Sequence, residues 1–275
     1  LLHMPKLIVQ ADDLAITHAA TLGIVQAVHE GMVRATGTFT NRPDAAFAAA
    51  QLAEVDELDV GLDLNMVTGS PLLPPSEVPG LVQPDGRFRT SHQIKAEFPI
   101  TARDGFYLSF DPDPFDHDQT LAEGRAQVRR FFDLFGRAPA YLHHHALVSD
   151  MLDQVLRELG EEFGVVVMDD LMRDGTLYQV PNPWYTVPFG PSEQAGCDPV
   201  AALLPELDAV AEHELSVLIS HPGYVDAELI DITSYNIVRA RDLELMLSPV
   251  VRTALDERGI ELATYTSCGL VASRL

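Results

Sequence analysis

Short apolar segments alternate with longer amphipathic segments along almost the whole chain, and this alternation limits the folds that the chain can adopt. Most of the short segments are rich in Val, Ile and Leu, which is typical of parallel strands covered on both faces. They comprise residues 7–11, 33–39, 59–66, 141–146, 165–168, 215–220 and 260–265. The segments between them predict helices that connect successive strands. The sequence therefore predicts an α/β fold with a barrel-like sheet of mostly parallel strands.

Length and charge narrow the class further. A chain of 275 residues suits one large α/β domain or two small ones. We expect residues 4–275 to form a single domain, with residues 1–3 as a cloning remnant. The 41 acidic residues exceed the 18 lysines and arginines, which gives a net charge of −23. This charge argues against nucleic acid and anionic membranes as partners and favours a neutral or cationic small ligand.

The sequence carries no signal for a membrane, a secretory pathway or a nucleotide. No apolar run reaches membrane-spanning length, and no secretory leader is recognisable. Cys197 and Cys268 have neither metal-like spacing nor a disulfide framework, so we expect a cytoplasmic protein. No glycine-rich loop follows a predicted strand, which argues against a nucleotide cofactor and phosphoryl transfer. The oligomeric state stays open, with a homodimer as one alternative.

Polar clusters follow four of the predicted strands at their C-terminal ends, where α/β folds collect their chemistry. Each cluster has a plainer interpretation, because Asp is a common helix cap and a single His is often a hydrogen-bonded core or surface residue. Buried carboxylates and imidazoles on one rim are nevertheless costly unless a metal or proton chemistry compensates them. The set suits zinc or a similar divalent ion. The clusters are Asp12 with Asp13, Asp63 with Asn65, His143 to His145, and His221.

Eight stretches of the chain resemble, in the right order, the YdjC-like carbohydrate deacetylase family. Residues 7–14 are similar to its opening strand, an apolar run followed by N-A-D-D-F-G, and residues 60–65 to its V-G-L-H-L-N. Residues 220–224 match its late H-P-G-Y. The remaining similar stretches are residues 69–74, 86–88, 123–131, 136–139 and 241–245. Together they cover most of the chain.

The resemblance implies a distorted (β/α) barrel related to polysaccharide deacetylases. It also implies removal of an N-acetyl group from an amino sugar, commonly a chitin-type disaccharide, with one divalent metal ion. By position, Asp12 takes the place of the general base on the metal-bound water, and Asp13 and His145 take the places of metal ligands. His221 takes the place of the general acid that protonates the leaving amine. Amide hydrolysis needs such a set of groups.

Two positions depart from the family pattern. Asp63 stands where the family has a metal-binding His, and His143 stands where it has an Asp. Asp13, Asp63 and His145 can still hold an ion, with harder oxygen ligation that favours Mg²⁺ or Mn²⁺ over Zn²⁺. Alternatively, His143 becomes a ligand. As a third alternative, metal affinity has dropped and the substrate or reaction has changed.

We therefore predict a metal-dependent hydrolase that removes an N-acetyl group from an amino sugar or short oligosaccharide. The alternatives are a related amide hydrolase with an altered substrate and a catalytically silent sugar-binding relative. Substrate contacts are expected from the long proline-rich loop at residues 69–114. Further candidates for substrate binding are Asn65, His143, Trp184 and Tyr185. We also expect the sharp turn after the first strand to bring Asp12 back towards the metal.

Overall fold

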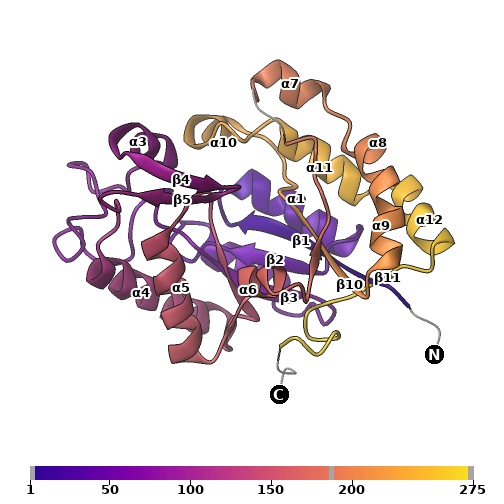
Figure 1. The fold of residues 1–275 in the computed structure, drawn as a ribbon, viewed down its shortest axis with the longest axis horizontal. Helices are drawn as coiled ribbons and strands as arrows, with labels where there is room; N and C mark the ends of the chain where they lie inside the picture. The colour runs from indigo at the N-terminus through magenta and orange to yellow at the C-terminus, as the bar shows by residue number, and fades with distance from the viewer. Residues whose placement is uncertain (1–3, 186–188, 272–275) are drawn as a thin grey trace.

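The computed structural model describes residues 4–185 and 189–271, and the predicted parallel sheet lies at its centre (Figure 1). Each neighbouring pair of strands in this sheet runs parallel, which confirms the predicted α/β arrangement. The strands lie in the order β8 (Val166–Val167), β6 (Tyr141–His144), β3 (Asp59–Leu64), β2 (Ala35–Thr38), β1 (Lys6–Leu14), β10 (Leu215–Ser220) and β9 (Tyr178–Gln179), with β11 (Glu261–Leu262) paired to the start of β1. The cloning remnant that we predicted at residues 1–3 lies outside the described residues.

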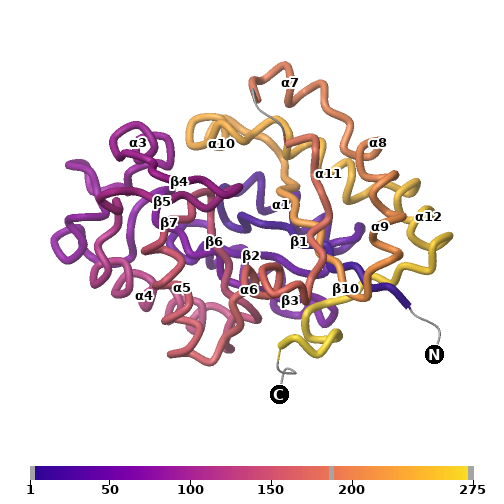
Figure 2. The backbone as a smooth tube through the Cα atoms, in the orientation of Figure 1, coloured from indigo at the N-terminus to yellow at the C-terminus, as the bar shows by residue number. Residues whose placement is uncertain are grey.

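Helices connect the strands and flank the sheet, as the backbone tube in Figure 2 shows. Helix α5 illustrates why they form, because its apolar residues recur every three or four positions and Leu152, Val155 and Leu159 are buried. Ser149 caps its first turn and the left-handed Gly164 ends it. The helices are α1 (His18–His29), α2 (Ala45–Leu52), α3 (Ser91–Glu97), α4 (His117–Phe135), α5 (Asp150–Phe163), α6 (Met168–Arg173), α7 (Pro191–Gly196), α8 (Pro199–Leu203), η1 (Leu204–Glu206), α9 (Leu207–Glu212), α10 (Ala227–Ile232), α11 (Val238–Met246) and α12 (Pro249–Glu257).

Two segments differ from the sequence-based expectation. The helix expected over residues 200–212 divides into α8, η1 and α9, because Pro205 has no N–H to continue an α-helical ladder. The loop at residues 69–114 contains helix α3 and a hairpin of β4 (Ile100–Asp104) and β5 (Tyr107–Phe110). Strand β5 then pairs with β7 (Val148–Ser149). Strand β4 is exposed along most of its length, so it lacks the apolar pattern that would have revealed it.

Three residues beside the C-terminal ends of β1 and β6 adopt the left-handed conformation although none of them is glycine. They are Asp13 (φ 69°), Ala15 (φ 74°) and Ala146 (φ 57°). This conformation costs an L-amino acid roughly 1–2 kcal/mol. Such strain commonly gathers at functional sites, where the surrounding structure holds it in place.

Replacing the exposed Ala146 with glycine is expected to stabilise the protein by about 0.5–1 kcal/mol, because relief of strain exceeds the added freedom of the unfolded chain. Urea denaturation monitored by circular dichroism measures the change. Gly136→Ala is the matched control, because Gly136 has φ 65° and open space around its Cβ position. It should lose a similar amount. A loss of stability in Ala146→Gly would contradict the prediction.

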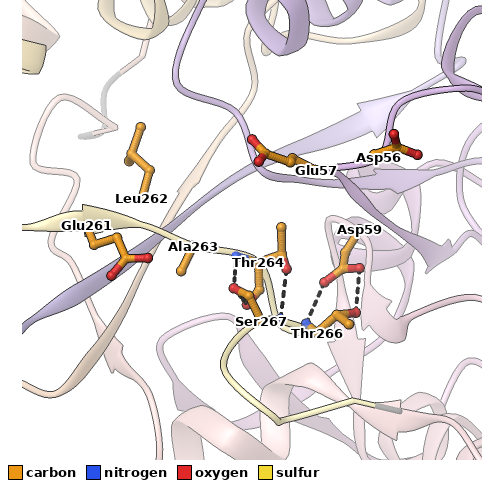
Figure 3. A pocket seen from close by; sticks show the side chains of 9 residues that line it. All are labelled: Asp56, Glu57, Asp59, Glu261, Leu262, Ala263, Thr264, Thr266 and Ser267. Atoms are coloured by element: carbon orange, nitrogen blue, oxygen red, sulfur yellow. Dashed lines mark hydrogen bonds between the residues drawn. The ribbon is translucent and has the colours of Figure 1, made fainter. Parts of the chain in front are cut away.

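The end of the sheet where the strands begin has a structural role. Figure 3 shows a pocket there, lined by residues of β3, β11 and the segments around them. Its volume is about 440 Å³. In it, Asp59 accepts hydrogen bonds of 2.8 Å from both the backbone N and the Oγ1 of Thr266. These bonds fasten the segment after β11 to the start of β3. The polar clusters lie at the opposite end, where the strands finish.

Candidate active site

The ends of β1, β3 and β6 bring Asp12, Asp63 and His143 together in the interior. His143 Nδ1 lies 3.3 Å from Asp12 Oδ2 and 3.5 Å from Asp63 Oδ1. Asp63 and His143 are direct partners in the parallel register of β3 and β6. Candidate ligand atoms of all three residues lie within 4.8 Å of one another. The three side chains therefore form a group that can hold a metal ion.

The buried charges of this group shift the pKa values of Asp63 and His143. Burial opposes a charged imidazole, but the carboxylates of Asp12 and Asp169 outweigh it and raise the pKa of His143 well above its usual value. Burial, together with the negative charge of Asp12, raises the pKa of Asp63 to about 7. Among the described residues, neither Asp63 Oδ1 nor His143 Nδ1 has a hydrogen-bond partner. Two buried polar atoms thus face each other without a satisfied hydrogen bond.

A second group surrounds Asp13, the other carboxylate of the pair. Asp13 Oδ1 lies 3.0 Å from His145 Nδ1, and Asp13 Oδ2 lies 2.5 Å from Arg239 Nη2. Burial alone would raise the pKa of Asp13, but Arg239 and His145 outweigh burial and hold this pKa well below its usual value. The backbone N of Asp13 donates to Asp63 Oδ2 at 3.0 Å, so the two groups adjoin.

The turn within β1 explains how two adjacent carboxylates reach different partners. The register between β1 and β2 shifts between Ala11 and Leu14, and Asp13 takes its left-handed conformation within that irregularity. Asp12 lies on the same strand face as Gln10, whose Nε2 donates a hydrogen bond of 2.7 Å to Asp12 Oδ1, and on this face it contacts His143. Asp12 thus lies beside Asp63 and His143. The expected return of Asp12 towards a metal ion stays a prediction.

His221 follows β10 and is oriented by Asp242. The backbone N of His221 donates to Asp242 Oδ2 at 2.8 Å, and its Nδ1 lies 3.4 Å from the hydroxyl of Tyr185. Tyr185 also donates to Asp242 Oδ2, and Trp184 Nε1 donates to Asp242 Oδ1 at 3.0 Å. Burial lowers the pKa of His221 to about 4, although the charge of Asp13 acts in the other direction. The ring is therefore neutral at neutral pH.

The other predicted substrate-binding residues have structural partners. Asn65 is fully buried, and its side chain bonds to Asn41 in the segment after β2 and to Val67 and Thr68 in the loop after β3. The Trp184 side chain is 5% exposed and packs in the core. Tyr185 is half-buried against His221. Stacking of either ring on a sugar stays a prediction.

Sequence reasoning assigned no role to three residues that the structure places in or beside the site: Arg239, Asp242 and Asp169. Asp242 lies within residues 241–245, a stretch whose resemblance we noted. Asp169 follows the short apolar strand at residues 165–168, so the same strand-end rule that selected Asp12 and Asp13 would have selected it. No local pattern marks Arg239, because its partner Asp13 is 226 positions away.

Comparison with known protein families shows which family the chain belongs to. The family model described as YdjC-like protein matches residues 6–257. The chain belongs to the YdjC-like family. Among curated relatives, a carbohydrate deacetylase of Geobacillus stearothermophilus is 27% identical over 95% of this chain and 98% of its own length. A chitooligosaccharide deacetylase of Salmonella schwarzengrund is 28% identical over 94% of this chain and 97% of its own length.

A solved structure supports the same fold. A protein of Enterococcus faecalis V583, described as a cellobiose-phosphate cleavage protein, superposes with a TM-score of 0.75 at 25% identity. The superposition covers 96% of this chain and 98% of that one. The distorted barrel that we expected from the resemblance is thereby confirmed. In the described parts of the chain, residues 4–185 and 189–271, no helix has the length and apolar character needed to span a bilayer.

Proposed function

We propose that this protein hydrolyses the N-acetyl group of an amino sugar or short chitin-type oligosaccharide. The observation that carries the proposal is the buried gathering of Asp12, Asp63 and His143 beside Asp13 and His145 at the C-terminal ends of β1, β3 and β6. The names of the curated relatives support a carbohydrate amide as the substrate. The strongly acidic chain also suits an uncharged sugar better than a phosphorylated one.

A divalent metal ion is part of the proposal, and the residues of the site fit one. Asp63 Oδ1 and His143 Nδ1 are buried without hydrogen-bond partners among the described residues, which fits a role as metal ligands. Carboxylate oxygens and imidazole nitrogens are suitable ligands for Zn²⁺, Mn²⁺ or Mg²⁺. When bound, such an ion polarises the amide carbonyl and activates a water molecule. Asp63 belongs to both candidate ligand sets, with Asp13 and His145 or with Asp12 and His143.

The residues of the chain supply the proton transfers. The resemblance assigns Asp12 as the base that takes a proton from water and His221 as the acid that protonates the leaving nitrogen. Because burial lowers the pKa of His221 to about 4, its ring must gain a proton during the reaction before it can donate one. Asp242 holds the backbone of His221, and Tyr185 lies beside its ring, so the imidazole keeps one orientation.

One observation favours a second candidate function, that of a catalytically silent sugar-binding relative. Arg239 already balances the charge of Asp13, one of the ligands that the resemblance implies, and His145 occupies its other oxygen at 3.0 Å. An arrangement that balances its charges without an ion has less need of one.

Acetate release from N-acetylated chitin-type oligosaccharides tests the proposal. We expect release by purified protein, loss after dialysis against EDTA, and recovery on addition of Zn²⁺, Mn²⁺ or Mg²⁺. Asp63→Asn should remove the activity while circular dichroism shows a folded protein. Binding of the sugar without acetate release, with or without added ion, would favour the silent relative instead.

A further inference from the structure

We propose that the metal ligands of this chain are Asp12, Asp63 and His143, and that Asp169 is a positioning residue that orients His143. The inference rests on the proposed function, since the ion belongs to it. It differs from the position-by-position resemblance, which makes Asp13 and His145 ligands and leaves Asp12 free to act as the base. With Asp12 as a ligand, this ligand set replaces that assignment of the base.

The first argument is which atoms are already engaged. Both nitrogens of His145 have partners, because Nδ1 faces Asp13 at 3.0 Å and Nε2 lies 3.1 Å from Thr68 Oγ1. Asp13 Oδ2 is held by Arg239, which already balances the charge of Asp13 even though Oδ1 makes no hydrogen bond. By contrast, Asp63 Oδ1 and His143 Nδ1 have no hydrogen-bond partner among the described residues. His143 Nδ1 makes only the longer contacts of 3.3 Å with Asp12 Oδ2 and 3.5 Å with Asp63 Oδ1, the two carboxylates that would share an ion with it. Unengaged donor atoms therefore gather around Asp63 and His143.

The second argument is the register of the sheet. Asp63 and His143 are direct partners across β3 and β6. The resemblance implies the same two kinds of group in the reverse order at these positions. The exchange keeps one carboxylate and one imidazole at this place. The imidazole now projects from β6 instead of β3, on the side where Asp12 lies 3.3 Å from its Nδ1. The carboxylate and imidazole at these paired positions therefore have Asp12 as their third neighbour.

The third argument is the carboxylate behind the ring of His143. Asp169 Oδ1 lies 3.9 Å from His143 Nε2, at the distance of an ionic contact, and the Asp169 side chain is almost fully buried at the start of α6. Tyr107 donates a 3.1 Å hydrogen bond to the same oxygen, and Arg173 Nη2 donates to the Tyr107 hydroxyl at 2.9 Å. A metal-binding His usually directs its second ring nitrogen at such a carboxylate, which fixes the ring and its tautomer. Asp169 is placed for that role.

The test measures Co²⁺ binding to the full chain by equilibrium dialysis and by the visible absorption of the bound ion. His143→Gln and Asp12→Asn are both expected to weaken binding at least about 100-fold, since each removes a ligand. Asp169→Asn should weaken it roughly 10–100-fold and change the absorption band, and Asp169→Glu should restore part of both. His145→Gln and Asp170→Asn, the neighbouring carboxylate on α6, should change affinity by less than about threefold.

The inference is overturned if His145→Gln removes Co²⁺ binding while Asp12→Asn and His143→Gln keep it, or if the wild-type chain binds no Co²⁺. Equal losses in Asp169→Asn and Asp170→Asn with an unchanged absorption band would overturn the role of Asp169. Acetate release is scored separately. Co²⁺ binding in the expected pattern without acetate release defeats only the proposed reaction, whereas acetate release with the pattern reversed defeats only this ligand assignment.

Discussion

Replacing His221 with alanine should slow hydrolysis of an N-acetylated chitin-type disaccharide by roughly 10²–10⁴ in kcat, the usual effect of losing a general acid. The leaving amine is a poor leaving group until it is protonated, so the amide reaction depends fully on the proton donor. An activated ester such as 4-nitrophenyl acetate leaves without that proton. We therefore expect a much smaller loss of kcat on the ester.

The comparison of the two substrates separates an acid from a residue that only orients or binds the sugar. His29→Ala is the matched control, because His29 is exposed at the end of α1, away from the strand ends. It should leave both rates unchanged. Equal losses on amide and ester in His221→Ala would show that His221 is not the acid.

The buried pair of Arg239 and Asp13 carries the largest expected effect on stability. Arg239 is 2% exposed, and its Nη2 lies 2.5 Å from Asp13 Oδ2. Arg239→Met leaves a buried carboxylate without its cation and should lower the free energy of unfolding by about 3–5 kcal/mol. Urea denaturation at pH 7 measures it. The double variant Arg239→Met with Asp13→Asn, which removes the unpaired charge, should recover a large part of the loss.

The pH dependence of this loss has a definite sign. Arg239 and His145 outweigh the effect of burial and hold the pKa of Asp13 below its value in the unfolded chain. The stabilisation is therefore fully present above the unfolded pKa of about 4 and is lost as the pH falls through the lower folded value. In Arg239→Met, burial raises the pKa of Asp13, so this carboxyl takes up its proton at a higher pH than in the wild type. The difference in unfolding free energy between wild type and Arg239→Met should therefore narrow as the pH falls from 7 towards 4 and below. A loss under about 1 kcal/mol at pH 7, or one that grows in acid, would contradict the assignment.

The order of strands and helices was predictable because each depends on residues close together in the chain. The apolar run of residues 7–11 predicts a buried strand whatever packs against it, and the same holds for residues 215–220. The hairpin of β4 and β5 was not predictable in this way. Its first strand, β4, is exposed and is held by pairing with β5 rather than by burial. Its sequence therefore lacks the alternation of apolar and polar residues that predicts a half-buried strand.

The site was predictable at the level of strand ends but not at the level of contacts. The rule that polar residues at strand ends converge brought Asp12, Asp13, Asp63 and the three histidines to one rim. Which carboxylate meets which imidazole depends on the left-handed conformation of Asp13 within an irregular register, and no residue pattern specifies that. The partner of Asp13 depends on α11, which is distant in sequence.

The side-by-side placement of Asp63 and His143 also constrains how such a site can evolve. His143→Asp alone would set two carboxylates against each other in the interior, where two like charges cannot both ionise without a large cost. Asp63→His alone would set two imidazoles there, with fewer carboxylates to balance them. Each single step towards the pattern that the resemblance implies is therefore expected to pass through a less stable intermediate. The residues at positions 63 and 143 are therefore expected to change together during evolution rather than one at a time.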